Sequence, residues 1–263
     1  MPHRTPILVV ALLLAGGALA SCENSQTTAP DTRPVEARQA QTNAQQFTDQ
    51  FHLERCTFIT KGRNPFLVLV PGYTQVLEGT DAGAPASLTI TVLDATAVIG
   101  GVTTRIIEER HVQDGVLVEI SRNYFAICRQ NNSVFYFGED TDIYANGQIV
   151  SHAGSWHHGA NGARAGLIMP GIQLLGSRYF QEIAPGVATD QAEITALETT
   201  VTTPLRTFTG VLVTRETSPL NPTSVDFKSF APGVGLVKSN DLLLVKAEYH
   251  NGDNTAGDGE QTP

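Results

Sequence analysis

Residues 142–152 read DIYANGQIVSH, and this stretch carries the strongest local signal for the fold. Asn146 and Gly147 stand between two short segments that contain apolar residues. Both residues adopt a positive φ readily, which the tight two-residue turn between antiparallel strands requires. The stretch therefore predicts a β-hairpin whose turn lies at residues 146 and 147.

Strand patterns recur over most of the chain. In SLTITVLD, residues 87–94, the apolar Leu88, Ile90 and Val92 alternate with threonine, which is the period of a strand with one buried face. The Asp-Gly pair at 114–115 predicts a second hairpin. Further strands are expected over residues 118–128, 134–140, 207–217, 224–230, 235–239 and 242–250.

Short connections between these segments favour antiparallel pairing of sequence neighbours. We therefore expect an all-β fold, a single antiparallel meander that forms a curved sheet or a partly open barrel. A β-sandwich is the alternative, because both architectures contain strands with the same alternation of apolar and polar residues.

The N-terminus has the features of an export signal. Residues 7–20, ILVVALLLAGGALA, form an apolar run of the length found in signal peptides and too short to span a membrane as a stable helix. The following LASC, residues 19–22, closely resembles the bacterial lipobox. That resemblance implies a lipoprotein signal peptide over residues 1–21 and lipidation of Cys22. An ordinary secretory signal with a chance cysteine is the alternative.

Lipidation would attach the protein to a membrane. Each buried methylene contributes ~0.8 kcal/mol, so two or three acyl chains anchor durably where one anchors marginally. We expect a protein of the bacterial cell envelope, anchored through its lipid, with its domain outside the cytoplasm. The sequence leaves the choice between inner and outer membrane open.

Composition divides the rest of the chain into three parts. Residues 22–46 are rich in Gln, Thr, Ala, Asn and Pro and poor in large apolar residues, which is typical of a flexible tether. Residues 47–250 contain the expected strands and form the predicted antiparallel β domain. Residues 251–263 have the composition of a disordered tail.

Charge and cysteine content restrict the partners and the compartment. The chain has 17 Lys and Arg against 26 Asp and Glu and no basic cluster, so no nucleic-acid partner is expected. Apart from Cys22, the cysteines are Cys56 and Cys128. In an oxidising compartment, an even pair is most simply a disulfide, with two buried thiols as the alternative.

A glycine-rich segment contains the best candidates for metal ligands. Residues 151–166, SHAGSWHHGANGARAG, hold three of the seven histidines, and imidazole is a common ligand of zinc. Carboxylates lie just across the predicted hairpin turn, and calcium on these acids alone is a further alternative. No cofactor is our first expectation, because no recognised ligand spacing is present. The candidate metal ligands are His152, His157, His158, Glu139, Asp140 and Asp142.

No catalytic residue can be named from the sequence. Ser155 lacks the flanking glycines of a nucleophile elbow. Acidic pairs such as Glu108 and Glu109 show no sign of the separation that glycoside hydrolysis needs. Consecutive apolar residues in FLVLVPG, GLIMPGIQLL and DLLLVKA indicate segments buried on both faces, which suits either a filled core or a cavity for a hydrophobic ligand.

Several motifs together resemble a known group of proteins. They are NPFLVLVPGYTQVLEG (64–79), YFGEDTDIYANGQIVSHAGSW (136–156), IMPG (168–171), QEIAPGVATDQAEI (181–194) and APGVGLVK (231–238). They resemble a family of uncharacterised secreted and lipid-anchored bacterial β proteins and, more loosely, the lipoprotein-carrier superfamily. The resemblance implies a curved antiparallel sheet and an extracytoplasmic location, and it implies no activity.

These observations predict a cell-envelope lipoprotein that acts as a non-catalytic binding or structural accessory module. Its expected partners are the membrane, reached through the lipid anchor, and an envelope protein or a hydrophobic ligand. Two alternatives stay open: an extracytoplasmic protein that binds a zinc-like metal through the histidine and carboxylate residues, and a carrier of a hydrophobic ligand.

Overall fold

The computed structural model describes residues 46–250, and over this range the protein is all-β, as predicted. Its helical content there is a single 3-10 turn, η1 (Leu53–Arg55). No helix in this range is long and apolar enough to cross a membrane. The predicted signal peptide, the lipidation site Cys22, nearly all of the tether and the C-terminal tail lie outside the described residues.

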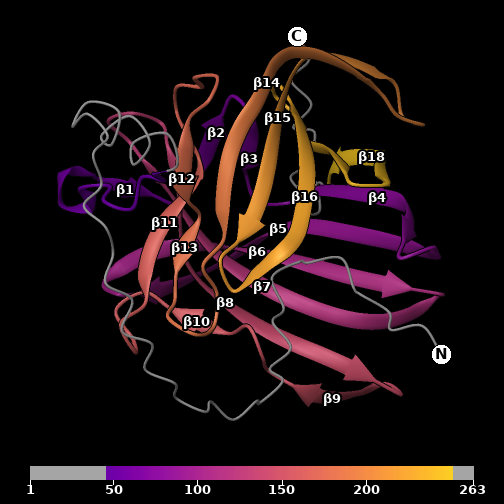
Figure 1. Ribbon diagram of the computed structural model, residues 1–263, viewed down its shortest axis with the longest axis horizontal. Coiled ribbons are helices and arrows are strands. Elements are labelled where there is room, and N and C mark those ends of the chain that lie inside the picture. Colours follow the sequence, from indigo (N-terminus) through magenta and orange to yellow (C-terminus); the bar gives the residue numbers. More distant parts are fainter. Residues whose placement is uncertain (1–45, 251–263) are drawn as a thin grey trace, which may run out of the picture.

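Two sets of neighbouring strands make up most of one 16-stranded sheet. The first set is a meander of β4 (Tyr73–Asp81), β5 (Ala84–Ile99), β6 (Val102–Gln113), β7 (Val116–Cys128) and β8 (Val134–Ala145). The second is a meander of β14 (Gln191–Thr202), β15 (Thr207–Ser218), β16 (Asn221–Ala231), β17 (Gly235–Ser239) and β18 (Leu242–Tyr249). In Figure 1, strands β14–β16 lie across strands β4–β8, so the inward faces of the two sets oppose each other.

Pairing between distant parts of the chain curls this sheet into a nearly closed barrel. On one side, β18 pairs with β4, which joins the two meanders. On the other side, β11 (Arg164–Met169) pairs with β8, β13 (Glu182–Ile183) pairs with β11, and β12 (Arg178–Phe180) pairs with β14. Only Gln181 separates β12 from β13, so one segment of the chain pairs with both edges of the sheet. The barrel is left unsealed at one seam, between these two short strands. The predicted barrel is confirmed, and the sandwich alternative is wrong.

Short strands complete the structure at the ends of the barrel. A separate two-stranded sheet pairs β2 (Gly62–Asn64) with β3 (Leu67–Leu69). The remaining short strands pair with β7 or β8 of the main sheet and are β1 (Phe58–Ile59), β9 (Gln148–Ser151) and β10 (Trp156–His157).

Both predicted hairpin turns are present. Asn146 and Gly147 have φ of 53° and 74° and connect β8 to β9, with Ala145 paired to Gln148. Asp114 and Gly115 have φ of 51° and 75° between β6 and β7. The positive φ values are the ones that these residue types adopt at low cost, so local chemistry sets the register of both hairpins.

A disulfide joins Cys56 to Cys128, as predicted, with 5.1 Å between the two Cα atoms. It links the segment that precedes β1 to the last residue of β7, across 72 positions of sequence. Phe58, two residues further on, packs edge-to-face against Phe135 and Phe137 of β8. The disulfide and this aromatic cluster therefore hold the N-terminal segment of the domain against the outside of β7 and β8.

Candidate functional site

The predicted metal ligands are divided among several small contacts. His152 Nδ1 lies 2.9 Å from Asp142 Oδ1, and His157 Nε2 lies 3.0 Å from Asp140 Oδ1. His158 Nδ1 accepts a hydrogen bond from the backbone N–H of Ala165. Each of the three histidines therefore has a partner within the protein, and no metal ion is needed to explain its position.

Glu139, the sixth candidate, is separated from the histidines. Its side chain is 1% exposed and lines the interior of the barrel. Among residues 46–250, no group of three or more His, Cys, Asp or Glu side chains is arranged to hold a metal ion. Zinc or calcium at these residues stays a prediction, which metal analysis of the purified protein tests.

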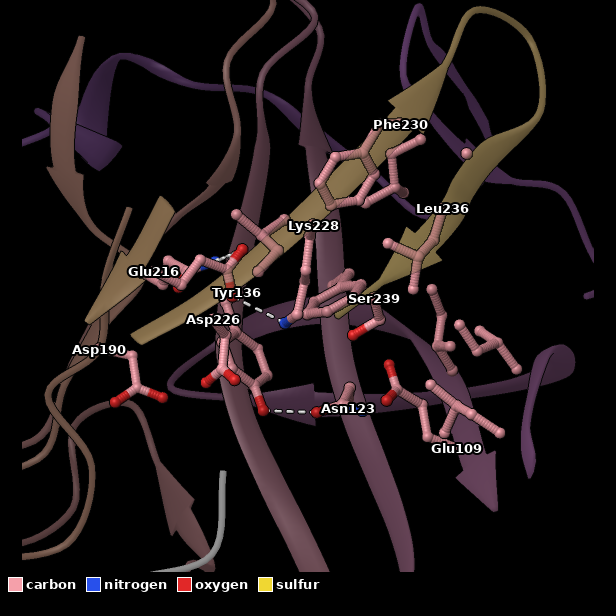
Figure 2. A pocket seen from close by; sticks show the side chains of 18 of the residues that line it. Glu109, Asn123, Tyr136, Asp190, Glu216, Asp226, Lys228, Phe230, Leu236 and Ser239 are labelled. Carbon is pink, nitrogen blue, oxygen red and sulfur yellow. Dashed lines mark hydrogen bonds and ion pairs between the residues drawn. The ribbon is translucent and has the colours of Figure 1, made fainter. Parts of the chain in front are cut away.

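The barrel encloses a cavity of about 130 Å³ between the two crossed sets of strands (Figure 2). One wall is apolar, and β5 contributes Leu88, Ile90 and Val92 to it. These are the residues whose alternation predicts a buried face. The same wall continues onto Phe125 of β7 and Phe230 of β16. An apolar ligand group in the cavity would therefore contact side chains from both sets of strands.

The rest of the cavity lining is polar and strongly acidic, and it comes from both sets of strands. Of the described residues that line the cavity, six are carboxylic acids and one, Lys228, is a basic residue. On β16, Ser224, Asp226, Lys228 and Phe230 face inward. The intervening Phe227 faces outward and is 48% exposed. The six acids are Glu109, Glu139, Glu182, Asp190, Glu216 and Asp226.

Lys228 forms an ion pair with one of these acids. Its Nζ lies 2.7 Å from Glu216 Oε2. The other oxygen of Glu216 accepts hydrogen bonds from Gln181 Nε2 at 3.3 Å and Thr214 Oγ1 at 3.1 Å. In Figure 2 the Lys228 ammonium group points toward Glu216, and the carboxyl groups of Asp226 and Glu109 lie to either side of it. Burial lowers the pKa of Lys228, but Glu216 and these other carboxylates outweigh burial, so its pKa is raised and the lysine stays charged.

Three of the other acids have polar contacts of their own. Asn240 Nδ2 donates to Asp226 Oδ1 at 2.6 Å. The backbone N–H of Asp190 donates to Glu182 Oε1 at 2.7 Å, and the carboxyl group of Asp190 is hydrogen-bonded to the side chain of Ser218. Burial raises the pKa of Asp190 to about 6 and raises the pKa values of Glu182 and Asp226 as well. Charged carboxylates in this part of the cavity therefore destabilise the fold, and their hydrogen bonds offset only part of that cost.

Glu139 has no such compensation. Neither of its carboxylate oxygens meets hydrogen-bond geometry with any described residue. The hydroxyl of Tyr136 is close enough to lower its pKa slightly, but that hydroxyl donates to Asn123 Oδ1. Burial, followed by the charges of Glu119 and Glu109, raises the pKa of Glu139 well above its ordinary value. The surroundings of Glu139 therefore favour the protonated form of its carboxyl group.

Sequence reasoning missed most of this site. Glu139 was predicted as a metal ligand at a hairpin, whereas it faces the barrel interior. The signal for Lys228 lies in SVDFKSF, residues 224–230, where charged and aromatic residues alternate. That alternation identifies a strand but not which face is inside, and the usual assumption would place Phe227 in the core.

Comparisons with known proteins give a weak structural likeness and no family. No protein-family model matches the chain, and no curated protein matches it. Among solved structures, the chain is similar to a predicted lipoprotein from Parabacteroides distasonis, with 14% identity and a TM-score of 0.35. The match covers 73% of this chain and 99% of that one. We draw no conclusion about function from a likeness at this level.

Proposed function

We propose that the protein is a cell-envelope lipoprotein, anchored through Cys22, whose barrel is a non-catalytic binding module for a small ligand. The observation that carries the proposal is the interior cavity, whose lining combines apolar side chains on β5 with buried acids from both sets of strands. A ligand with an apolar part and a polar part would contact both kinds of side chain at once.

Packing supports a binding role over a purely structural one. Protein interiors contain few voids larger than a water molecule. The cavity volume of about 130 Å³ is close to that of engineered apolar cavities that bind benzene. Burying carboxylic acids without partners destabilises a fold, so a barrel that served only as a scaffold would be more stable with apolar residues there.

The size of the cavity also limits the ligand. Pockets for drug-sized molecules usually measure about 300–1,000 Å³, and this cavity is smaller. Acids also interrupt the apolar lining, since Glu109 is paired with Ile90, and the acyl chains of a lipid would have to lie against them. We therefore propose a small organic molecule as the ligand in place of a whole lipid.

Titration with benzyl alcohol, an uncharged probe of suitable size, tests whether the cavity binds. Methyl NMR resonances of Leu88, Ile90 and Val92 should shift in a saturable way, because these side chains form the apolar wall. In Val92→Phe, the added ring would occupy the cavity, since Val92 is only 2% exposed, and binding should be lost. Val98→Phe is the matched control on the same strand, at a side chain that is 68% exposed.

Unsaturable shifts, or equal binding by the two variants, would refute an interior site. The anchor is tested separately by cell fractionation of the full chain. Wild-type protein should sediment with membranes, and Cys22→Ser should be released because it cannot be acylated. Equal membrane association of both proteins would contradict lipidation at Cys22.

A further inference from the structure

The charge balance of the cavity indicates what kind of ligand it would bind. Six acids face one lysine, and Glu216 already holds the ammonium group of that lysine at 2.7 Å. Asp226, Glu182 and Asp190 have the neutral hydrogen-bond partners described above. Glu139 is approached by the Tyr136 hydroxyl, but that hydroxyl donates to Asn123, so neither oxygen of Glu139 meets hydrogen-bond geometry with any described residue although the side chain is 1% exposed and lines the cavity. A buried acceptor without a donor costs ~1–3 kcal/mol, so this position is suited to a donor brought by a ligand.

The surroundings of Glu139 favour a positively charged donor. Glu109 on β6 and Glu119 on β7 are the strongest charged neighbours that act on its carboxyl group. Asp190, which precedes β14, and Glu182 on β13 act on it more weakly. All four are acids, and one oxygen of Glu119 is also without a hydrogen-bond partner. The described ionisable groups whose charges act on Glu139 are therefore all acids, and none of them is a cation that would compensate its charge.

The geometry also distinguishes between two classes of cation. No three acidic or histidine side chains of residues 46–250 come together closely enough to ligate one metal ion. An ammonium group has three N–H donors and accepts oxygens that are spread further apart. Leu88, Ile90 and Val92 on β5 line the same cavity as Glu139, and a hydrated metal ion would leave these apolar side chains unused.

We propose that the cavity binds a small primary ammonium compound, with its charged nitrogen at Glu139 and its apolar group against Leu88, Ile90 and Val92. This inference rests on the proposed function, since it names the ligand class of the same cavity. Lys228 repels a cation near Glu216, so the ammonium group is directed to Glu139, on which no interaction with Lys228 is found.

Binding of such a cation requires a charged carboxylate. Because its surroundings favour the protonated form of Glu139, the ammonium ligand displaces a proton to solvent as the ion pair forms. Binding should therefore release about one proton, and affinity should rise as the pH is raised. A neutral ligand of the same shape should release none.

Benzylammonium and benzyl alcohol form a suitable pair of probes, because they share one shape and differ in charge. We expect isothermal titration calorimetry at pH 7 to give benzylammonium about tenfold or more tighter binding than benzyl alcohol, from one charge-assisted hydrogen bond. Titrations in two buffers of different ionisation enthalpy should show proton release for benzylammonium alone. Benzoate should not bind, because the acids around the cavity repel it.

Glu139→Gln tests the assignment to this residue. The variant should bind benzyl alcohol like the wild type and lose the preference for benzylammonium. Glu78→Gln is the control, since Glu78 is exposed on β4 and does not line the cavity. Proton release by the wild type tests the same point without any substitution, should the variant fold poorly.

The outcomes separate the two proposals. Equal binding of both probes by the wild type, with both lost in Val92→Phe, would overturn the ammonium inference and leave the binding cavity standing. Absence of binding by either probe would overturn both. A preference for benzylammonium that survives in Glu139→Gln, or that is accompanied by no proton release, would overturn the role of Glu139.

Discussion

Replacing Lys228 by methionine removes the only basic residue among the described residues that line the cavity, and it preserves most of the side-chain volume. Removal of one partner from a buried ion pair typically costs about 3–5 kcal/mol, because the other charge is left uncompensated. Glu216 keeps its hydrogen bonds from Gln181 and Thr214 in the variant, which reduces the loss. We therefore expect the free energy of unfolding to fall by about 3 kcal/mol, the lower end of that range.

Two further variants separate the ion pair from other effects. Glu216→Gln should cost only about 1 kcal/mol, because Asp226 and Glu109 still act on Lys228. The double variant should be more stable than Lys228→Met alone, since it contains no uncompensated glutamate at 216. The cycle should give a coupling energy of about 2 kcal/mol, within the range found for residues in contact.

Urea unfolding at pH 7 and pH 5 measures these values, provided that the slope with urea is unchanged. The loss in Lys228→Met should be smaller at pH 5, because burial raises the pKa values of the neighbouring Glu109 and Asp226 and protonation relieves their repulsion. A loss below about 0.5 kcal/mol at pH 7, or additive effects in the double variant, would refute an energetically important ion pair inside the barrel.

Three other predictions concern stability. Cys56→Ala with Cys128→Ala opens a loop of 72 positions and should lower the free energy of unfolding by ~4 kcal/mol, and a loss below ~1 kcal/mol in urea would contradict this. Burial raises the pKa of Asp190 to about 6 and that of Glu119 to about 8, so the folded state binds these protons more tightly than the unfolded state. The melting temperature should therefore rise as the pH falls from 8 to 5. Glu119→Gln should flatten the profile of melting temperature against pH above pH 6. A flat profile for the wild type would argue against buried acids. Gly171→Ala would place its Cβ 1.7 Å from the carbonyl oxygen of Asn131 and should cost more than ~2 kcal/mol, whereas the Cβ in Gly62→Ala meets the flexible end of Ile127 at 3.0 Å. Similar losses in these two variants would contradict the close backbone approach at Gly171.

The sequence predicts the local features of this fold well because each depends on a few adjacent residues. The turn at Asn146-Gly147 follows from two residues that tolerate positive φ. The inward face of β5 follows from the alternation of Leu88, Ile90 and Val92. Barrel closure is different, because β18 pairs with β4 across most of the chain and no local pattern specifies that contact.

The candidate site was less predictable for a related physical reason. A strand pattern gives a period of two but does not tell which face is inside. In β16 the polar face of Asp226 and Lys228 turns inward, while Phe227 and Val225 are partly exposed. Burial of the polar face becomes favourable only when Glu216 on β15 and Asn240 after β17 are brought into contact with it. The three histidines of residues 151–166 predicted a metal site instead, and in the structure His152 and His157 pair with nearby aspartates.

A crystal structure of the protein with benzylammonium tests the central claim most directly. The account predicts the ring inside the barrel, against Leu88, Ile90 and Val92, with the nitrogen about 2.7–3.2 Å from a carboxylate oxygen of Glu139. A barrel interior without the probe, or a probe bound only to the outer surface of the strands, would contradict it.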